Sequence, residues 1–136
     1  MSVHLEFFHP DRIVVGVGRG NVAIEEYAKF LMDIVQAGVL HYRKIIDISS
    51  ASSETMGPSD FAKFEQMLAA RANQNGLVRG PLAIIISPDQ QAQAQAFKAM
   101  SSKDRPVEVF YSIRDARKWL LTHPVVQPER RTQPPA

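Results

Sequence analysis

Residues 82–90 read LAIIISPDQ, an aliphatic run that changes abruptly into the signals of a helix start. The segment Leu82–Ser87 is the most hydrophobic in the chain, which is typical of a strand inside a sheet that is covered on both faces. Ser87 can cap the next helix, with Pro88 at its first position and Gln90 three residues after the cap. The QAQAQA repeat that follows has period two, but alanine and glutamine favour helix, so this helix is predicted to reach Met100.

The rest of the chain repeats this alternation of strand and helix. A hairpin is predicted over Val3–Phe8 and Arg12–Val17, because the turn between them contains Pro10 and Asp11. The later elements are a helix from a cap at Asn21 to a stop at Gly38, a strand over 44–48, a helix over 58–72, a strand over 106–111 and a helix from a cap at Ser112 to Pro124. The order ββαβαβαβα predicts an α/β fold: one domain with a mixed, mostly parallel five-stranded sheet, an N-terminal β-hairpin and four helices.

Apolar side chains at helical spacing mark the faces by which the first and last helices pack. They are Ile24, Tyr27, Leu31, Ile34 and Val35 in the first helix, and Ile113, Ala116, Trp119 and Leu120 in the last. The basic side chains Arg114, Arg117 and Lys118 are expected to form the solvated face of the last helix.

The composition is that of an ordinary globular domain, with 45% hydrophobic and 22% charged residues among 136. We expect the domain to cover residues 1–123, and the Pro-rich polar tail at 124–136 to be flexible. The chain has no cysteine, which excludes disulfides and Cys-ligated zinc and fits a cytoplasmic location. It lacks a signal-peptide pattern, and its apolar runs are far shorter than the roughly 18 residues that span a membrane.

The charges give no sign of a nucleic-acid or metal site. The net charge is only +2, from 16 basic and 14 acidic residues, and the basic residues are scattered along the chain. A nucleic-acid-binding face usually concentrates them, so no nucleic-acid partner is predicted. The four histidines form no i,i+3 or i,i+4 pair, so neither a helical metal site nor a cofactor is expected.

The stretch GVGRGN at Gly16–Asn21 is the nearest approach to a nucleotide-binding loop. Counted from Gly18, the looser pattern G-x-G-x-x-A fits and ends at Ala23, and Asp47 lies where a ribose-binding acid could follow. The preceding strand, however, looks like half of a hairpin rather than the first strand of a βαβ unit. The other interpretation is a strand exit at which backbones pass closely.

Three segments, taken in their order and spacing, resemble the STAS domain family, the anti-sigma-factor antagonist fold, and especially its SpoIIAA-like branch. They are RIVVGVGRGN at 12–21, YRKIIDISSAS at 42–52 and VEVFYSIRDARKWL at 107–120. The second resembles the family's strand that ends in an aspartate followed by a small hydroxyl residue. The third resembles its closing strand and helix, with Asp115, Ala116, Trp119 and Leu120 in the matching pattern. The resemblance covers about residues 3–123.

The resemblance implies a non-catalytic regulatory or protein-binding module of the bacterial cytoplasm, with a kinase-like or signalling protein as partner. The module would present the loop at 47–57 and the following helix start. The loop residues concerned are Asp47, Ser49, Ser50, Ser52, Ser53, Thr55 and Gly57. Antagonist members of the family carry a phosphorylatable serine in this segment. Aligned on Gly57, that position is Met56, so phosphorylation is predicted at Thr55 or Ser53 instead.

Two alternatives stay open from the residues. Phe61, Phe64 and Met67 predict a pocket between helices and sheet for a small apolar or lipid-like ligand, a role with which some relatives of this fold are associated. An enzyme of unknown class would use Asp47 together with His41, although a serine hydrolase would lack its G-x-S-x-G elbow.

A polar rim is also predicted at the carboxyl ends of the strands, where open α/β sheets bind ligands. Its members are Asp47, Ser49, Ser87 and Ser112. Ser87 and Ser112 are better explained as helix caps, whereas Asp47 and Ser49 fit a binding surface and a structural role equally well.

Overall fold

A five-stranded sheet forms the centre of the computed structural model, which describes residues 3–52, 58–74, 76–101 and 105–125. The strands are β1 (Val3–Phe8), β2 (Ile13–Asn21), β3 (Arg43–Ser52), β4 (Leu82–Ile85) and β5 (Val107–Phe110), and they lie side by side in that order. β1 runs antiparallel to β2, and β2 to β5 are mutually parallel. The predicted α/β fold is therefore confirmed, including the N-terminal hairpin.

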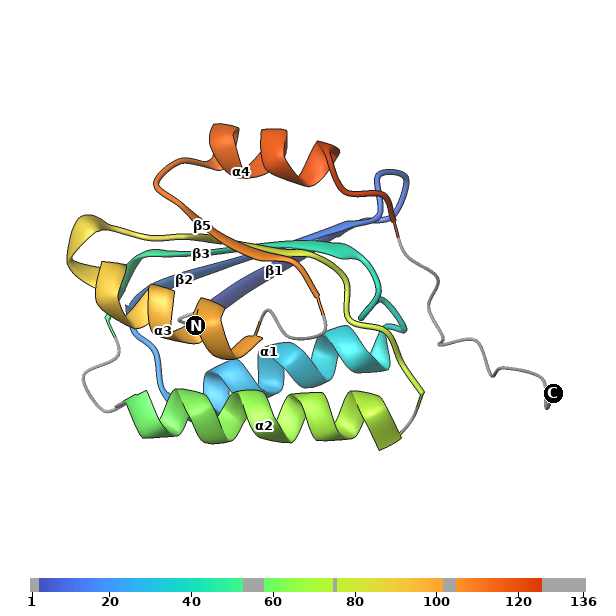
Figure 1. Cartoon of the computed structure of the whole chain (residues 1–136), viewed down its shortest axis with the longest axis horizontal. Coiled ribbons are helices and arrows are strands. Elements are labelled where there is room, and N and C mark those ends of the chain that lie inside the picture. Colours follow the sequence, from blue (N-terminus) through green and yellow to red (C-terminus); the bar gives the residue numbers. More distant parts are fainter. Residues whose placement is uncertain (1–2, 53–57, 75, 102–104, 126–136) are drawn as a thin grey trace, which may run out of the picture.

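The helices lie on both faces of the sheet, in unequal numbers. They are α1 (Ile24–Gln36), α2 (Pro58–Gln74), α3 (Gln91–Ser101) with a preceding 3₁₀ turn η1 (Pro88–Gln90), and α4 (Ile113–Leu121). Figure 1 shows α1, α2 and α3 on one side and α4 alone on the other. Right-handed connections between strands that are added in one direction place every crossover helix on the same face. α4 follows the last strand and is free to cover the opposite face.

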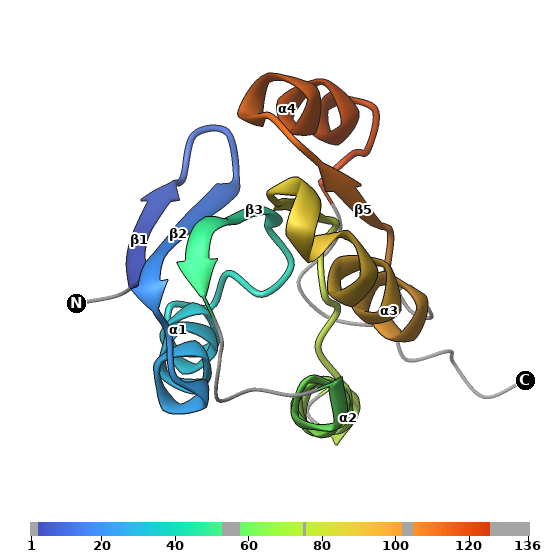
Figure 2. The ribbon, with the colours of Figure 1, turned by 90° about the vertical axis from the view of Figure 1, so that its left-hand side faces the viewer.

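α2 does not pack on the sheet as α1 and α3 do. Seen along the strands in Figure 2, it lies farther from the sheet, beneath the space between α1 and α3. The side chains of α2 that turn inward, such as Glu65 and Ala72, are buried. α2 therefore covers the sheet face between α1 and α3 without packing directly on it. The cavity described below lies in the space between α2 and the sheet.

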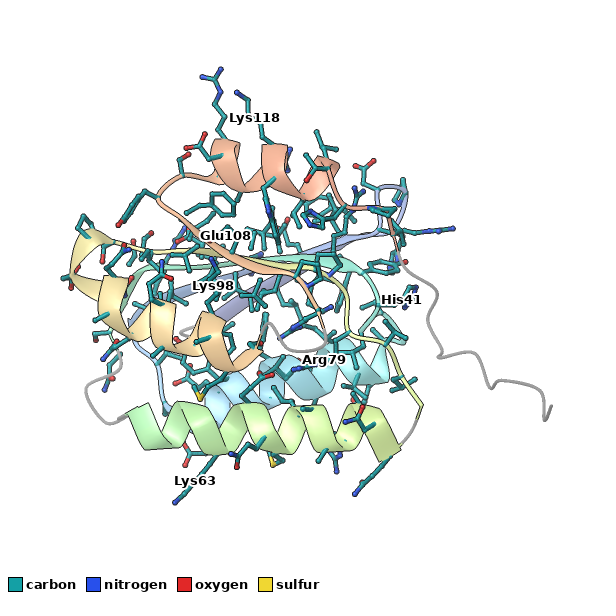
Figure 3. All side chains as sticks on the ribbon, viewed as in Figure 1. His41, Lys63, Arg79, Lys98, Glu108 and Lys118 are labelled. Atoms are coloured by element: carbon teal, nitrogen blue, oxygen red, sulfur yellow. The ribbon has the colours of Figure 1, made fainter. Side chains whose placement is uncertain are left out.

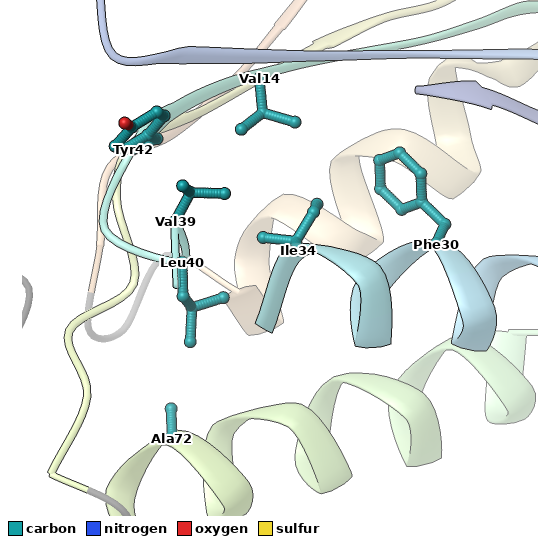
Figure 4. Packing of buried hydrophobic residues seen from close by; sticks show 7 residues of the cluster. All are labelled: Val14, Phe30, Ile34, Val39, Leu40, Tyr42 and Ala72. Carbon is teal, nitrogen blue, oxygen red and sulfur yellow. The ribbon is translucent and has the colours of Figure 1, made fainter. Parts of the chain in front are cut away.

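The core is built on both faces from the aliphatic strands that the sequence predicts. On the α4 side, Ala116 and Leu120 pack on Ile45 and Ile85. On the other side, α1 packs Phe30 and Ile34 against Val14, Val39, Leu40, Tyr42 and Ala72, as Figure 4 shows. A Cβ at Gly16 would collide with the ring of Phe30, so this glycine makes the close approach of α1 to β2 sterically feasible.

The end of β2 differs from the prediction. The strand continues to Asn21 instead of ending at Val17; it pairs with β1 as far as Gly18 and with β3 as far as Asn21. Asn21 is therefore not the cap of α1; that position is Ala23, which has no side-chain cap bond. A phosphate-binding loop needs backbone N–H groups that are free to meet a ligand, whereas this glycine-rich segment is a strand. The segment Gly16–Asn21 is thus part of β2 and not the loop that the nucleotide-binding interpretation expects.

Smaller details of the last two helices follow the predicted signals only in part. Gln90 accepts from the backbone N–H of Ser87 at 2.9 Å, as a capping box requires, but the first turn is 3₁₀ rather than α. Ser112 caps α4 through the backbone N–H of Asp115 at 3.2 Å, as predicted. Ile113 was expected on the inner face of α4 and is instead exposed, because the first turn of α4 extends past the edge of the core.

The basic face of α4 is exposed, as predicted for Arg114, Arg117 and Lys118. Figure 3 shows Lys118 pointing away from the sheet, and Lys63 doing the same on α2. Of the predicted tail at 124–136, only Pro124 and Val125 lie within the described residues.

Candidate functional site

A cavity of about 360 Å³ lies between the sheet and the three helices α1, α2 and α3. Most of its wall is apolar and comes from several elements. Representative lining residues are Tyr27 and Phe30 of α1, Leu68 of α2, Ile46 of β3, Ile84 of β4 and Phe97 of α3. The volume falls within the range of about 300–1,000 Å³ that is typical of small-molecule sites. The cavity is thus large enough to hold a ligand.

Two cationic side chains, Lys44 and Arg105, line one end of this cavity. Lys44 pairs in register with Leu82 of β4, and Leu82 with Val107 of β5, so both cations lie at the amino ends of the parallel strands. Side chains alternate along a strand, and Lys44 therefore faces the same way as Ile46, toward α1–α3. Both side chains are buried, with 1% of Lys44 and 8% of Arg105 exposed.

The amine of Lys44 is held by the backbone just before β3. Its Nζ donates to the carbonyl oxygen of Tyr42 at 2.8 Å and also to that of Leu40. These acceptors offset part of the cost of removing the amine from water. Burial, followed by repulsion from Arg105 and Arg79, holds the pKa of Lys44 well below its usual value.

A buried carboxylate balances the neighbouring guanidinium groups. Glu65 of α2 lies 2.6 Å from Arg79 and 4.0 Å from Arg105, and all three side chains are almost fully buried. In Figure 3, Arg79 lies between the sheet and the helices beneath it. Arg105 also donates to the hydroxyl of Ser101 at 3.2 Å. This ionic cluster joins α2 to the segments that precede β4 and β5.

The opposite end of the cavity is lined by neutral and acidic polar residues, Ser52, Asp89, Gln90 and Gln93. Gln90 donates through its side-chain amide to the carbonyl oxygens of Ile48 and Ala51, at 2.8 and 3.0 Å. β3 extends beyond the end of β4 here, so these carbonyls have no β4 partner in the ladder. Gln90 thus fastens the far part of β3 to the start of α3.

Asp47 and Ser49 lie within strand β3, at a local irregularity, and not in a loop. The register with β2 passes from Val17↔Asp47 to Arg19↔Ser50, so β3 carries one extra residue at this point, a β-bulge. The carboxylate of Asp47 accepts from the N–H of Ser49 at 3.0 Å and from its hydroxyl at 2.6 Å. Asp47 therefore satisfies a backbone N–H at the bulge, and this explains an acidic residue inside an apolar strand.

The predicted partner-binding loop is largely a strand. β3 was expected to end near Ile48, but it continues to Ser52, so Asp47, Ser49, Ser50 and Ser52 all belong to it. Ser50 and Ser52 pair with β2. The prediction missed this pairing because small hydroxyl residues usually mark turns. Ser53, Thr55 and Gly57 lie outside the described residues, and so does Met56.

The pocket was predicted to be lined by residues of α2, and α2 does line the cavity, although not through Met67. Met67 lies on the outer side of α2 and is 55% exposed, so it does not line the cavity; the α2 residue that does is Leu68. The error is one of helical phase, since adjacent residues on a helix point about 100° apart. The side chains of Phe61 and Phe64 lie outside what the structure describes.

The catalytic alternative with His41 and Asp47 has no geometric support. His41 precedes β3, while Asp47 lies in its middle, at the level of the carboxyl end of β4. At about 3.3 Å per strand residue, Arg43 and Asp47 alone are roughly 13 Å apart, so the two side chains are at opposite ends of the strand segment. Ser87 and Ser112 of the predicted polar rim follow β4 and β5, where Ser112 acts as a helix cap.

The described part of the chain offers neither a metal site nor a membrane span. No group of three or more His, Asp or Glu side chains there could bind a metal ion. No helix there is long and apolar enough to cross a membrane.

Similarity to known proteins is found in structure and not in sequence. No protein-family model matches the chain, and no curated protein is significantly similar to it. Its structure resembles that of an uncharacterized DUF3478-family protein with a SpoIIAA-like fold from Shewanella loihica PV-4. The two chains are 19% identical and align over 87% of this chain and 91% of the other, with a TM-score of 0.58. The chain has a SpoIIAA-like fold.

The likeness confirms the fold expected from the resemblance to STAS domains, and at this identity it concerns the fold alone. The charged residues of this SpoIIAA-like domain were not anticipated from the sequence. One signal was present for Glu65: with Phe61, Leu68 and Ala72 it follows the i, i+4, i+7, i+11 spacing of one helix face. Lys44 carried a weaker signal, since it alternates with Ile46 and Ile48 in a strand.

The lowered pKa of Lys44 predicts a pH-dependent contribution to stability. Between the folded pKa of Lys44 and its unfolded value near 10.5, the unfolded chain binds more protons, so this contribution rises with pH and is lost as pH falls. The slope is at most about 1.4 kcal/mol per pH unit. Because the substitution also leaves the carbonyls of Leu40 and Tyr42 without the amine at every pH, the prediction concerns the pH dependence: the stability of Lys44→Met relative to wild type is higher at about pH 7.5 than at about pH 9.5.

Urea unfolding at the two pH values measures this difference directly. Lys29→Met is the matched control, because Lys29 is exposed on α1 and its removal leaves the wild-type pH dependence unchanged. A difference between Lys44→Met and wild type that does not vary with pH contradicts the prediction.

Proposed function

We propose that this SpoIIAA-like domain is a non-catalytic binding module whose cavity holds a small apolar or lipid-like molecule. The observation that supports it is the apolar hollow of about 360 Å³ between the sheet and α1–α3. Both the volume and the mostly apolar wall are those of a small-molecule site.

The arrangement of α2 supports access to this cavity. α2 contacts α3 but lies away from the sheet, so the cavity is closed on this side by a helix in a second layer. α2 is held in this layer by Ala72 in the core and by the ion pair of Glu65 with Arg79, so it moves only at the cost of these contacts. A ligand could enter without disrupting the sheet.

Filling the cavity tests the proposal. Ala94 lines it from α3 and is 5% exposed, whereas Ala96 lies on the solvent side of the same helix. We expect the uncharged fluorescent probe N-phenylnaphthylamine to bind wild type and Ala96→Phe alike, and to bind Ala94→Phe at least about tenfold more weakly, a loss of about 1.4 kcal/mol.

Fluorescence titration gives the affinities, and circular dichroism checks that both variants are folded. Absence of probe binding by wild type, or equal binding by Ala94→Phe, contradicts a ligand-binding cavity.

We also propose, as a second function, that the end of β3 meets a protein partner. Ser50 and Ser52 are exposed there, and Ser52 also lines the cavity. A partner bound at this edge would therefore contact the cavity wall, and its binding would depend on whether the cavity holds a ligand. The predicted phosphorylation at Thr55 or Ser53 belongs to this proposal. Intact-mass analysis of protein from native cells is its test: a phosphate within residues 49–57 supports it, and unmodified protein under all growth conditions opposes it.

A further inference from the structure

The polar groups of the cavity are divided between its two ends. Lys44 and Arg105 line the end at the amino edge of the sheet, while Asp89 and Gln93 line the other. Along β3 the lining runs from Lys44 to Ser52, eight residue steps, which correspond to more than about 20 Å even with the bulge. The wall between the ends is apolar, with Ile46, Ile48 and Phe97 among its residues. An elongated apolar cavity with one cationic end matches an amphipathic anion.

Building on the proposed function, we infer that the cavity takes an alkyl carboxylate, with its carboxylate at Lys44 and Arg105 and its chain along β3. Lys44 can contribute a hydrogen bond. A bound carboxylate would favour the protonated form of Lys44, and the ammonium group then has three donors, of which the carbonyls of Leu40 and Tyr42 occupy two. Arg105 adds a guanidinium group, whose planar fork suits a carboxylate.

The local charge favours an anion over a neutral or cationic headgroup. Arg105 and Arg79 bring two positive charges against the single negative charge of Glu65, so this end of the cavity carries net positive charge even while Lys44 is neutral. The neighbouring carboxylate, that of Glu65, is nearer to Arg79 than to Arg105. In a buried site such charges act through a low effective dielectric constant and are strongly felt. A carboxylate there would be attracted, and an ammonium group repelled.

The other end sets the direction of the ligand. Asp89 brings a negative charge, and the amide of Gln90 is engaged with the carbonyls of β3. A carboxylate is therefore disfavoured there, and the tail of the ligand would point toward the end of β3. A volume of about 360 Å³ is about twelve times the roughly 30 Å³ of one water molecule. Decanoate, with ten carbon and two oxygen atoms (about twelve non-hydrogen atoms), is a suitable probe for a cavity of this size.

Headgroup selectivity tests the inference. Decanoate, its neutral isostere decanamide and the cation decylamine are each used at about pH 7.5 to displace N-phenylnaphthylamine from the cavity. We expect decanoate to bind at least about tenfold more tightly than decanamide, since hydrogen bonds to charged groups are the stronger ones, and decylamine to bind most weakly. Lys44→Met should lose most of the preference for decanoate over decanamide. Lys29→Met, the exposed control, should keep it.

The outcomes separate this inference from the proposed function. If the probe binds but decanoate is no tighter than decanamide, the assignment of an acidic headgroup is wrong and the apolar cavity stands. A preference for decanoate that survives in Lys44→Met likewise overturns the role of Lys44. If neither the probe nor any of the decyl compounds binds wild type, both proposals fail. The comparison of ligands on wild type alone remains decisive if Lys44→Met does not fold.

Discussion

The amine of Lys44 is buried under the central strand, and an amine in that position needs oxygen acceptors close by. The carbonyls of Leu40 and Tyr42 provide them, so the chain between α1 and β3 must curl back over the side chain. Gly80 fixes this path from the other side. Its N–H donates to Leu40 at 2.9 Å, and a Cβ at Gly80 would collide with the carbonyls of His41 and Tyr42. The amino edge of the sheet is organised around this one contact.

The same constraint gives the cavity its chemical character. Lys44 lies at the start of β3, and Arg79 and Arg105 lie in the segments that precede β4 and β5, so parallel pairing brings all three to one edge of the sheet. Removing several cations from water is costly, and a well-packed apolar replacement is often as stable or more stable. A structural role alone therefore gives little reason to retain them beside an apolar hollow. Recognition of an acidic ligand gives such a reason.

The sequence was sufficient to predict the order of elements, because long apolar strands and capping signals such as those at Ser112 are local. It misplaced the end of β3, since Ser49–Ser52 have the composition of a turn and become a strand through pairing with β2 and the Gln90 contacts. The buried charges could not be predicted in the same way, because the ion pair of Glu65 and Arg79 forms between two different segments and is visible only in the folded structure. The prediction placed the binding surface at the carboxyl ends of the strands, where ligands of α/β sheets usually bind, and it therefore missed Lys44 at the amino end.

A crystal structure of the domain in complex with decanoate would test the central claim most directly. The account predicts the carboxylate within hydrogen-bonding distance, about 2.7–2.9 Å, of Lys44 Nζ or the Arg105 guanidinium, with the chain lying along Ile46 and Ile48. Decanoate bound in the reverse direction, with its carboxylate beside Asp89, or bound only at the outer surface while the cavity is filled by side chains, would contradict it.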